Sequence, residues 1–394
     1  MQSGDTQRKR WFLALTLVLL LLLPYIASAI RWGGSIPGYG VFPAQLVQPP
    51  PGFNLRYFIF LAAVAGLITL LLLVPRLFGF RKVPPQPRPT PARLPRWFWI
   101  ALPIWLISWF LTWARLPVGV NLEQYTFVPL WWSFILVLDG WVYRRTGGAS
   151  LVATRPNTMK LLAAVSCISW FMFEYLNFFV LENWYYPNDE VFTNFGNMVL
   201  FAASYTTVLP AIFEWYTLLR TVPKLDVRYQ KGPKIAFPKP VVWVLFVLGA
   251  VMTFGMGYFP YLLFWGVWVA LIPLVGAALA LAGFWTPLRD IARRGDWSKV
   301  CLVGLGTLCN GFFWEMWNFG SEWFHDGAPV NPNYWKYSVP YVDVIHIFSE
   351  MPLLGYYGYI LFGVNCWILW LIAAHLLGFS PTIDLVADAD AIER

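Results

Sequence analysis

Apolar runs of about twenty residues recur along this chain and restrict what it can fold into. Hydrophobic residues make up 58% of the 394 positions, and charged residues only 12%. A helix needs about 20 apolar residues to cross the hydrocarbon core of a bilayer, where only helices or closed barrels satisfy the backbone. Because the runs are continuous rather than alternating, we predict an all-α, polytopic transmembrane helical bundle. Its ten expected spans cover residues 11–30, 57–75, 97–114, 126–143, 160–180, 197–219, 241–258, 260–284, 299–319 and 353–377.

The placement of positive charge predicts how these spans are oriented. The net charge is +8, and 24 of the 28 Lys and Arg residues fall at the two termini or in alternate connecting segments. Because an excess of Lys and Arg marks cytoplasmic loops, we expect a multi-pass protein of a bacterial inner (plasma) membrane with both termini cytoplasmic. The basic loops would contact membrane lipids with anionic headgroups. No basic patch is left over for nucleic acid.

The first apolar run allows two interpretations. It follows the basic residues Arg8, Lys9 and Arg10 and ends near the triplet Ala27-Ser28-Ala29, a pattern that also fits a signal peptide. Its length, up to Ile30, favours an uncleaved first helix.

Two basic, proline-containing stretches divide the chain. Residues 81–96 contain six prolines, which predict a stiff cytoplasmic linker after two N-terminal helices in residues 1–80. We expect a first four-helix repeat at 97–239 and a second at 240–394, which ends in a cytoplasmic tail. Repeats with an even number of spans share one orientation, so an axis along the membrane normal should relate them.

Two strings with the spacing aromatic-Glu-x-x-Asn-Phe indicate this duplication. FEYLNF occupies 173–178 and WEMWNF occupies 314–319, 141 residues later, and Pro210 and Pro352 recur at an offset of 142. Because proline cannot continue a regular helix without losing a hydrogen bond, we expect Pro210 to bend the sixth span. We expect a short interfacial or re-entrant helix near 340–350, before a kink at Pro352.

The two strings supply the candidate catalytic residues. Glu and Asn three positions apart share one helix face, and an ionisable side chain within a membrane span marks a functional site by default. We assign acid/base roles to Glu174 and Glu315 and orienting roles to Asn177 and Asn318, and we place Glu350 beside the second pair. The alternative is that these groups brace helices through interhelical hydrogen bonds.

Aromatic residues near the strings are candidates for a ligand-binding site. Many of the 24 tryptophans fall at expected span ends, where aromatic belts form. Others lie at the level of the strings and could line a groove for a lipid, an isoprenoid or a cationic intermediate. The candidate substrate-binding residues are Trp184, Tyr185, Trp314, Trp317 and Trp335. Bulk packing is the commoner role of such residues.

Other polar residues predict no further chemistry. Asp139 and Glu214 lie at the cytoplasmic ends of their spans, and we expect them to pair with Arg144, Arg145 or Arg220. The four cysteines form no CxxC or CxxCH arrangement. The chain also lacks P-loop, GxSxG and HExxH patterns. We therefore expect no metal and no cofactor.

Several strings between residues 97 and 378 resemble a group of uncharacterised bacterial polytopic membrane proteins. They are YTFVPLWWSFILVLDGWVYRRTG at 125–147, FEYLNF with NWYY at 183–186, WEMWNF, and EMPLLGYYGY at 350–359. The resemblance implies a fold and no catalytic residues. A remote resemblance to membrane-embedded lycopene cyclases rests on repeated helical units with intramembrane carboxylates beside prolines. Here Glu350 precedes Pro352, whereas that family places the proline first.

The sequence thus predicts an integral membrane protein with a paired Glu/Asn site in the extracytoplasmic half of the bilayer. The expected function is to bind, or to process by acid/base chemistry, a lipid or isoprenoid, and whether the protein is an enzyme stays open at this point. One alternative is a proton-coupled carrier of a small molecule. Another is a non-catalytic scaffold or accessory subunit, whose partners would be membrane-complex subunits or a second copy of the chain.

Overall fold

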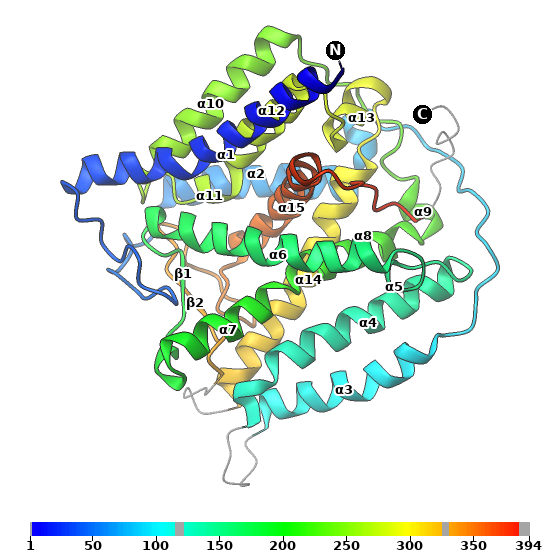
Figure 1. Ribbon diagram of the computed structural model, residues 1–394, viewed down its shortest axis with the longest axis horizontal. Helices are drawn as coiled ribbons and strands as arrows, with labels where there is room; N and C mark the ends of the chain where they lie inside the picture. Colours follow the sequence, from blue (N-terminus) through cyan, green and yellow to red (C-terminus); the bar gives the residue numbers. More distant parts are fainter. Residues whose placement is uncertain (1, 115–121, 325–330, 386–394) are drawn as a thin grey trace.

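A computed structural model describes residues 2–114, 122–324 and 331–385 of the chain (Figure 1). Its longer helices are α1 (Gln2–Trp32), α2 (Leu55–Leu73), α3 (Arg96–Trp113), α4 (Phe127–Arg145), α6 (Pro156–Asn177), α7 (Asn194–Tyr205), α8 (Val208–Arg220), α10 (Lys239–Tyr258), α14 (Ser298–Trp323) and α15 (Tyr356–Leu377). The shorter ones are α5 (Leu151–Thr154), α9 (Pro223–Asp226), α11 (Gly266–Val269), α12 (Ala277–Leu281) and α13 (Pro287–Arg294).

Seven helical segments of the described residues are long and apolar enough to cross a membrane. They are Gly4–Trp32, Leu55–Leu73, Pro156–Val180, Asn194–Arg220, Lys239–Tyr258, Ser298–Trp323 and Leu353–Leu377. Each coincides with one of the expected spans. The prediction of an all-α bundle of membrane type is therefore confirmed.

The other three expected spans differ from these seven. α3 and α4 are 18 and 19 residues long, but tryptophan and polar residues replace much of the aliphatic content that the seven helices carry. The run at 260–284 is broken into α11, a π-helical turn at Ile272–Gly276 and α12. Pro273 lies inside that turn, and proline removes one hydrogen bond of a regular helix. The expectation of ten membrane-length apolar helices is therefore met only in part.

The helices pack as parallel, antiparallel and crossed pairs. α1 packs along α10, α3 along α4, and α14 against both α8 and α15. Gly257 shows how closely α1 and α10 approach, because a Cβ atom at this position would lie 2.3 Å from the carbonyl oxygen of Pro24. Small residues at helix interfaces permit such contact between backbones.

Pro210 lies in the first turn of α8, and Pro352 lies just before the 3₁₀ turn at Leu353–Gly355, where the preceding residues form no helix for it to kink. α7 ends at Tyr205 and α8 begins at Val208, so the break precedes Pro210, as expected. The prediction of a helix near 340–350 is wrong, because this segment is irregular up to a 3₁₀ turn at Leu353–Gly355. Tyr341 and Ile345 adopt positive φ values of 65° and 61° there, which no right-handed helix accommodates.

A two-stranded antiparallel sheet joins the loops that follow the two Glu-x-x-Asn strings. β1 (Trp184–Tyr185) pairs with β2 (Lys336–Tyr337), with Trp184 opposite Tyr337 and Tyr185 opposite Lys336. In Figure 1 this sheet lies at the left end of the molecule, opposite the two termini, α9 and α13.

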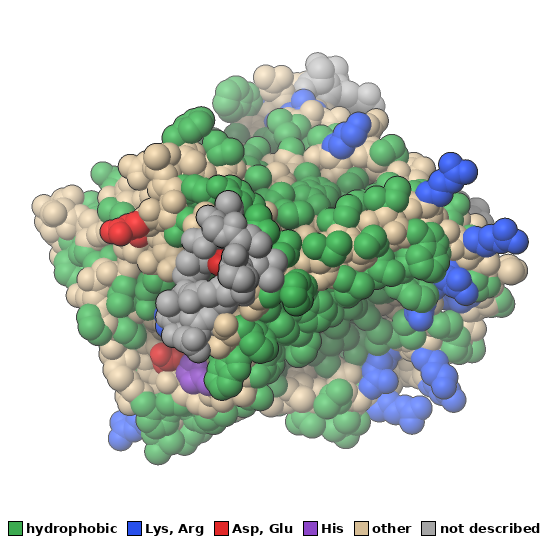
Figure 2. Space-filling view, turned by 90° about the horizontal axis from the view of Figure 1, so that it is seen from below, with side chains coloured by type: hydrophobic (Ala, Val, Ile, Leu, Met, Phe, Trp, Pro, Cys, Tyr) green, Lys and Arg blue, Asp and Glu red, His purple; other side chains and the backbone are tan. Residues whose placement is uncertain are grey.

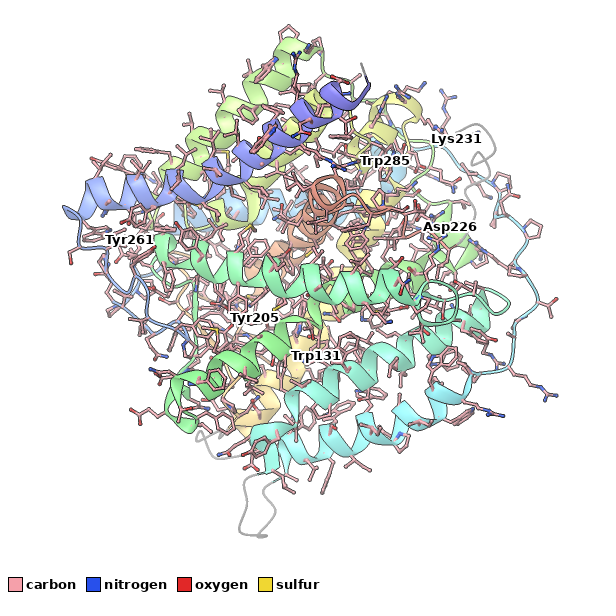
Figure 3. All side chains as sticks on the ribbon, in the orientation of Figure 1. Trp131, Tyr205, Asp226, Lys231, Tyr261 and Trp285 are labelled. Carbon is pink, nitrogen blue, oxygen red and sulfur yellow. The ribbon has the colours of Figure 1, made fainter. Side chains whose placement is uncertain are left out.

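The two ends of the molecule differ in charge. Figure 2 shows a broad band of hydrophobic side chains, with most of the visible Lys and Arg side chains gathered at one end. In Figure 3, Asp226 and Lys231 lie at the end that holds the termini, Tyr261 lies at the opposite end, and Tyr205 and Trp131 lie inside the bundle. This arrangement is compatible with an embedded helical bundle whose long axis crosses the membrane.

Candidate functional site

Glu174 accepts hydrogen bonds from four aromatic side chains. Trp170 Nε1 donates over 2.9 Å, Tyr186 OH over 2.7 Å and Tyr205 OH over 3.0 Å to Oε1, and Trp184 Nε1 lies 3.1 and 3.2 Å from the two oxygens. The side chain is 2% exposed. An ionised carboxylate is a pure acceptor, so this set of donors suits a carboxylate held in a dry surround.

Glu315 has fewer partners of the same kind. Tyr337 OH donates to its Oε1 over 2.6 Å, and Tyr359 OH over 2.5 Å. Trp335 Nε1 donates in turn to Tyr337 OH over 2.8 Å. The second oxygen of Glu315 is buried and has no hydrogen-bond partner among the described residues. The two carboxylates therefore stand in similar surroundings, but only Glu174 has both of its oxygens partnered.

The two asparagines hold the loops that carry these aromatic groups. Asn177 Nδ2 donates to the carbonyl oxygen of Trp184, and Asn318 Nδ2 to that of Trp335, both over 2.8 Å. Asn318 Oδ1 also accepts from the backbone N–H of Trp335 over 3.0 Å. Asn177 thus holds β1, and Asn318 holds the residue before β2. Each Asn lies about one helical turn beyond its Glu and has a positioning role.

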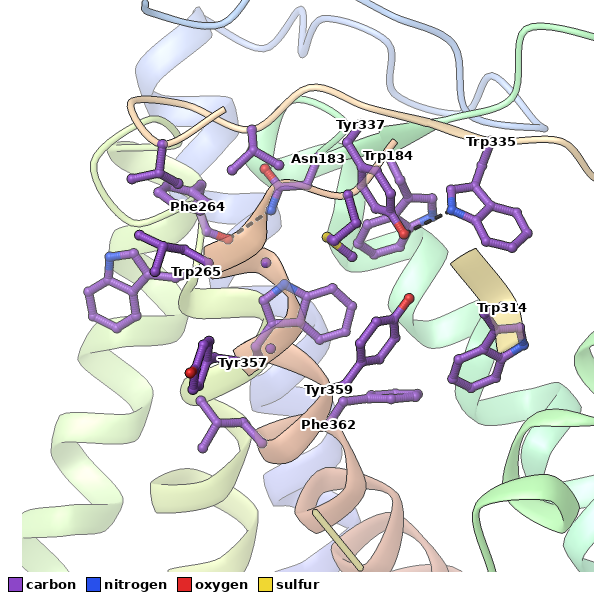
Figure 4. Close-up of a pocket in the computed structure, with 18 of the residues that line it drawn as sticks. Asn183, Trp184, Phe264, Trp265, Trp314, Trp335, Tyr337, Tyr357, Tyr359 and Phe362 are labelled. Atoms are coloured by element: carbon purple, nitrogen blue, oxygen red, sulfur yellow. Dashed lines mark hydrogen bonds between the residues drawn. The ribbon is translucent and has the colours of Figure 1, made fainter. Parts of the chain in front are cut away.

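A cavity of about 360 Å³ lies between the two carboxylates. Its walls come from α2, α6, α7, α11, α14, α15, the first residues of α4 and α8, and the loops around β1 and β2, and they are mostly apolar and aromatic (Figure 4). Glu174 and Glu315 are not part of the wall. The residues that donate hydrogen bonds to them do line the cavity. These are Trp170, Trp184, Tyr186, Tyr205, Tyr337 and Tyr359. The carboxylates therefore lie one hydrogen bond behind its surface.

Glu350 belongs to a separate polar cluster at the rim. Tyr334 OH donates to Glu350 over 3.2 Å, while Lys336 forms an ion pair of 2.8 Å with Glu322. Burial is the main reason why the pKa of Glu350 lies above its ordinary value, and hydrogen bonding to Glu322 adds to the rise. The structure therefore places Glu350 among Glu322, Lys336 and Tyr334.

The predicted binding residues divide into two groups. Trp184, Trp314 and Trp335 line the cavity. Tyr185 pairs with Lys336 in the small sheet instead, and Trp317 packs against Trp131, with ring centroids 4.8 Å apart.

Sequence reasoning missed the four tyrosines that contact the carboxylates. Tyr186 and Tyr337 occupy the same position in the strings WYY and WKY, a signal that could have found them. Tyr205 and Tyr359 come from other helices and carry no local signal.

The expectation for Asp139 and Glu214 is wrong. Asp139 accepts hydrogen bonds from Trp97 Nε1, Ser150 Oγ and the backbone N–H of Val152, at 2.9 to 3.0 Å, rather than from an arginine. Glu214 is fully buried, and none of the described arginines forms an ion pair with it. Arg220 pairs with Asp226 and Asp384 at 2.9 and 2.7 Å. The start of α5 folds over Asp139 and supplies the donors that an arginine would otherwise provide.

Comparison of the chain with protein-family models, with curated proteins and with solved structures gave no significant match. The resemblances named above therefore stay predictions, and the function must be argued from the site.

Proposed function

We propose that this protein binds a membrane amphiphile, a lipid or an isoprenoid, in the aromatic cavity between Glu174 and Glu315. The observation that carries the proposal is the cavity itself, because about 360 Å³ of space is within the range of small-molecule sites. Its wall is largely apolar with a few tyrosine hydroxyls, which suits a long hydrophobic body better than a water-soluble solute. A scaffold needs no such space.

Helix α2 supports entry of the ligand from the bilayer. Val64, Ala65 and Ile68 on one side of α2 line the cavity, while Ile59 and Leu67 are each 58% exposed. A helix that separates a cavity from the lipid phase by a single layer lets an amphiphile enter without passing through water.

The hydrogen-bond directions favour binding over acid/base chemistry. Tyr186, Tyr205, Tyr337 and Tyr359 all donate their protons to the glutamates. Their aromatic rings line the space, and their hydroxyl protons are used behind it. We therefore assign Glu174 and Glu315 as positioning residues that fix the tyrosine rings, with Asn177 and Asn318 fixing the loops. The proton-coupled carrier stays an alternative prediction.

We also propose that the polypeptide crosses the membrane ten times, with its basic end cytoplasmic. Contacts at that end support the number. The backbone N–H of Gly232, before α10, donates to the carbonyl oxygen of Gly295, after α13, over 2.8 Å. This bond places the start of α10 and the end of α13 at the same end of the molecule. If α10 crosses the membrane, the broken segment that follows it, up to α12, must therefore cross back. The backbone N–H of Ala92, before α3, likewise donates to the carbonyl oxygen of Arg144, at the end of α4, over 2.9 Å.

We propose two parallel four-helix repeats as well. The Glu and Asn of each string have matching contacts with Trp and Tyr residues, which supports this duplication.

The experiment fills the cavity from a glycine. Gly358 lines the cavity, and a Cβ atom there would meet nothing within 4 Å. A Cβ atom at Gly66 would also meet nothing within 4 Å, but Gly66 is exposed on α2 and does not line the cavity. Gly358→Phe should therefore occupy ligand space, whereas Gly66→Phe makes the same change facing the lipid. The three proteins are purified in mild detergent, and retained lipids are identified and quantified by mass spectrometry.

We expect the wild type and Gly66→Phe to retain one amphiphile in near-stoichiometric amount. Gly358→Phe should retain at least about tenfold less, which corresponds to a loss of about 1.4 kcal/mol of binding free energy. Thermal unfolding of all three proteins checks that the fold persists. Equal retention by the three proteins, or retention by none, would contradict the proposal.

A further inference from the structure

Several of the hydrogen-bond donors around the cavity are used within the protein. Trp170 and Trp184 donate to Glu174, and Trp335 donates to the hydroxyl of Tyr337. Trp265 Nε1 donates to Tyr57 OH over 2.6 Å, and Asn183 Nδ2 donates to the carbonyl oxygen of Phe264 over 2.9 Å. Among the described residues, the wall offers an anionic headgroup uncharged donors, such as the indole N–H groups of Trp268 and Trp314, and no Lys or Arg side chain.

Two amide oxygens of lining residues lack a hydrogen-bond partner among the described residues. Oδ1 of Asn183 and Oδ1 of Asn333 are buried and have no hydrogen-bond partner among the described residues. Both residues line the cavity, and each is 3% exposed. A buried polar atom without a partner is costly. Both oxygens are covered by neighbouring atoms rather than open to the cavity, so they add negative partial charge behind its wall, which favours a positively charged ligand group.

The electrostatic surround has the same sign. Among the described residues, no Lys, Arg or His lines the cavity, while Glu174 and Glu315 lie one hydrogen bond behind its wall. Indole and phenol rings also line the space (Figure 4), among them Trp184, Trp335 and Tyr359. The faces of such rings attract cations, most strongly where water is excluded.

We propose that the ligand of this cavity is a cationic amphiphile, with an ammonium group on an apolar body. The ammonium group would lie among the aromatic side chains, in front of the carboxylates and amide oxygens behind the wall, and the apolar body would lie along the wall formed by α2. An anionic headgroup would face two carboxylates without a counter-charge. This inference rests on the proposed function, because it names the chemical class of the ligand that the cavity takes.

The experiment compares two probes that differ in a single charged atom. They are the decyl ether of choline and decyl 3,3-dimethylbutyl ether, in which carbon replaces the quaternary nitrogen. Nanodiscs of an uncharged glycolipid, with and without the protein, are dialysed against each other. Each probe is then quantified by chromatography after extraction. The amount of each probe in empty nanodiscs measures its partition into lipid and is subtracted. Nanodiscs that contain Gly358→Phe test whether the remaining probe is bound in the cavity.

For each probe, the measured quantity is its excess in nanodiscs with protein over empty nanodiscs. We expect this excess to be about tenfold larger for the cationic probe than for the neutral probe, as a desolvated cation–π site predicts. This excess should disappear in Gly358→Phe. An equal excess of both probes would overturn the charge preference and leave the proposed binding function standing. An excess of neither probe would overturn both proposals. A cationic excess that persists in Gly358→Phe would place the site elsewhere and overturn this inference.

Discussion

Glu182 shows how far a carboxyl group is removed from water at this end of the molecule. It lies in the loop between the first Glu-x-x-Asn string and β1, with a positive φ of 54°. The side chain is fully buried, and neither carboxyl oxygen has a hydrogen-bond partner among the described residues. Burial, with the nearby Glu174 carboxylate as a second cause, raises the pKa of Glu182 to about 9.

This raised pKa predicts that stability falls as pH rises. The ordinary pKa of Glu182 is 4.5, and below it both folded and unfolded chains hold the proton. Between pH 4.5 and about 9 the unfolded chain is ionised and the folded chain is not, so the free energy of unfolding decreases by up to several kcal/mol.

Thermal unfolding in detergent at a series of pH values between 5 and 9 measures this effect. Glu182→Gln cannot ionise, and its unfolding temperature should depend less on pH than that of the wild type. Parallel profiles for the two proteins would show that Glu182 does not set this dependence.

The residue scale also shows what sequence could predict about the site. The spacing of Glu and Asn placed each carboxylate one turn before its amide, and the structure has both pairs in that arrangement. Tyr205 and Tyr359 could not be predicted as partners, because they approach the carboxylates from α7 and α15 through tertiary packing.

At the scale of elements, continuous apolar runs were sufficient to predict seven membrane-length helices. The same reasoning was weaker for α3 and α4, whose tryptophans pack within the protein: Trp105 and Trp109 of α3 both lie against Trp317. It failed for residues 340–350, where positive φ values replace a helix. The pairing of β1 with β2 joins residues 151 and 153 positions apart and had no local signal.

The orientation of these elements gives a further prediction. Lys231 and Ser35 are both exposed and lie in opposite ends of the proposed topology. In a variant without the four native cysteines, Ser35→Cys should react with a membrane-impermeant maleimide on intact spheroplasts, because its loop follows the first crossing. Lys231→Cys should react only after permeabilisation, because it lies in the basic segment before α10. The reverse pattern would invert the proposed topology.

At the scale of the whole molecule, the two Glu-x-x-Asn strings converge on one cavity. β1 and β2 bring their following loops together, and α14, α15 and α6 supply the walls between the two carboxylates. Placing both strings in the extracytoplasmic half puts the cavity opposite the basic end. In the proposed function, the molecule combines an aromatic site for a bilayer component with a wall, α2, that faces the lipid.

The most direct test of this account is the structure of the wild-type protein determined by cryo-electron microscopy in native-lipid nanodiscs. The account predicts elongated ligand density between Trp184 and Tyr359, in contact with the tyrosines that hold Glu174 and Glu315. It predicts no such density in Gly358→Phe prepared in the same way. Side chains that close the space between Tyr337 and Trp268, with no ligand density in the wild type, would contradict it.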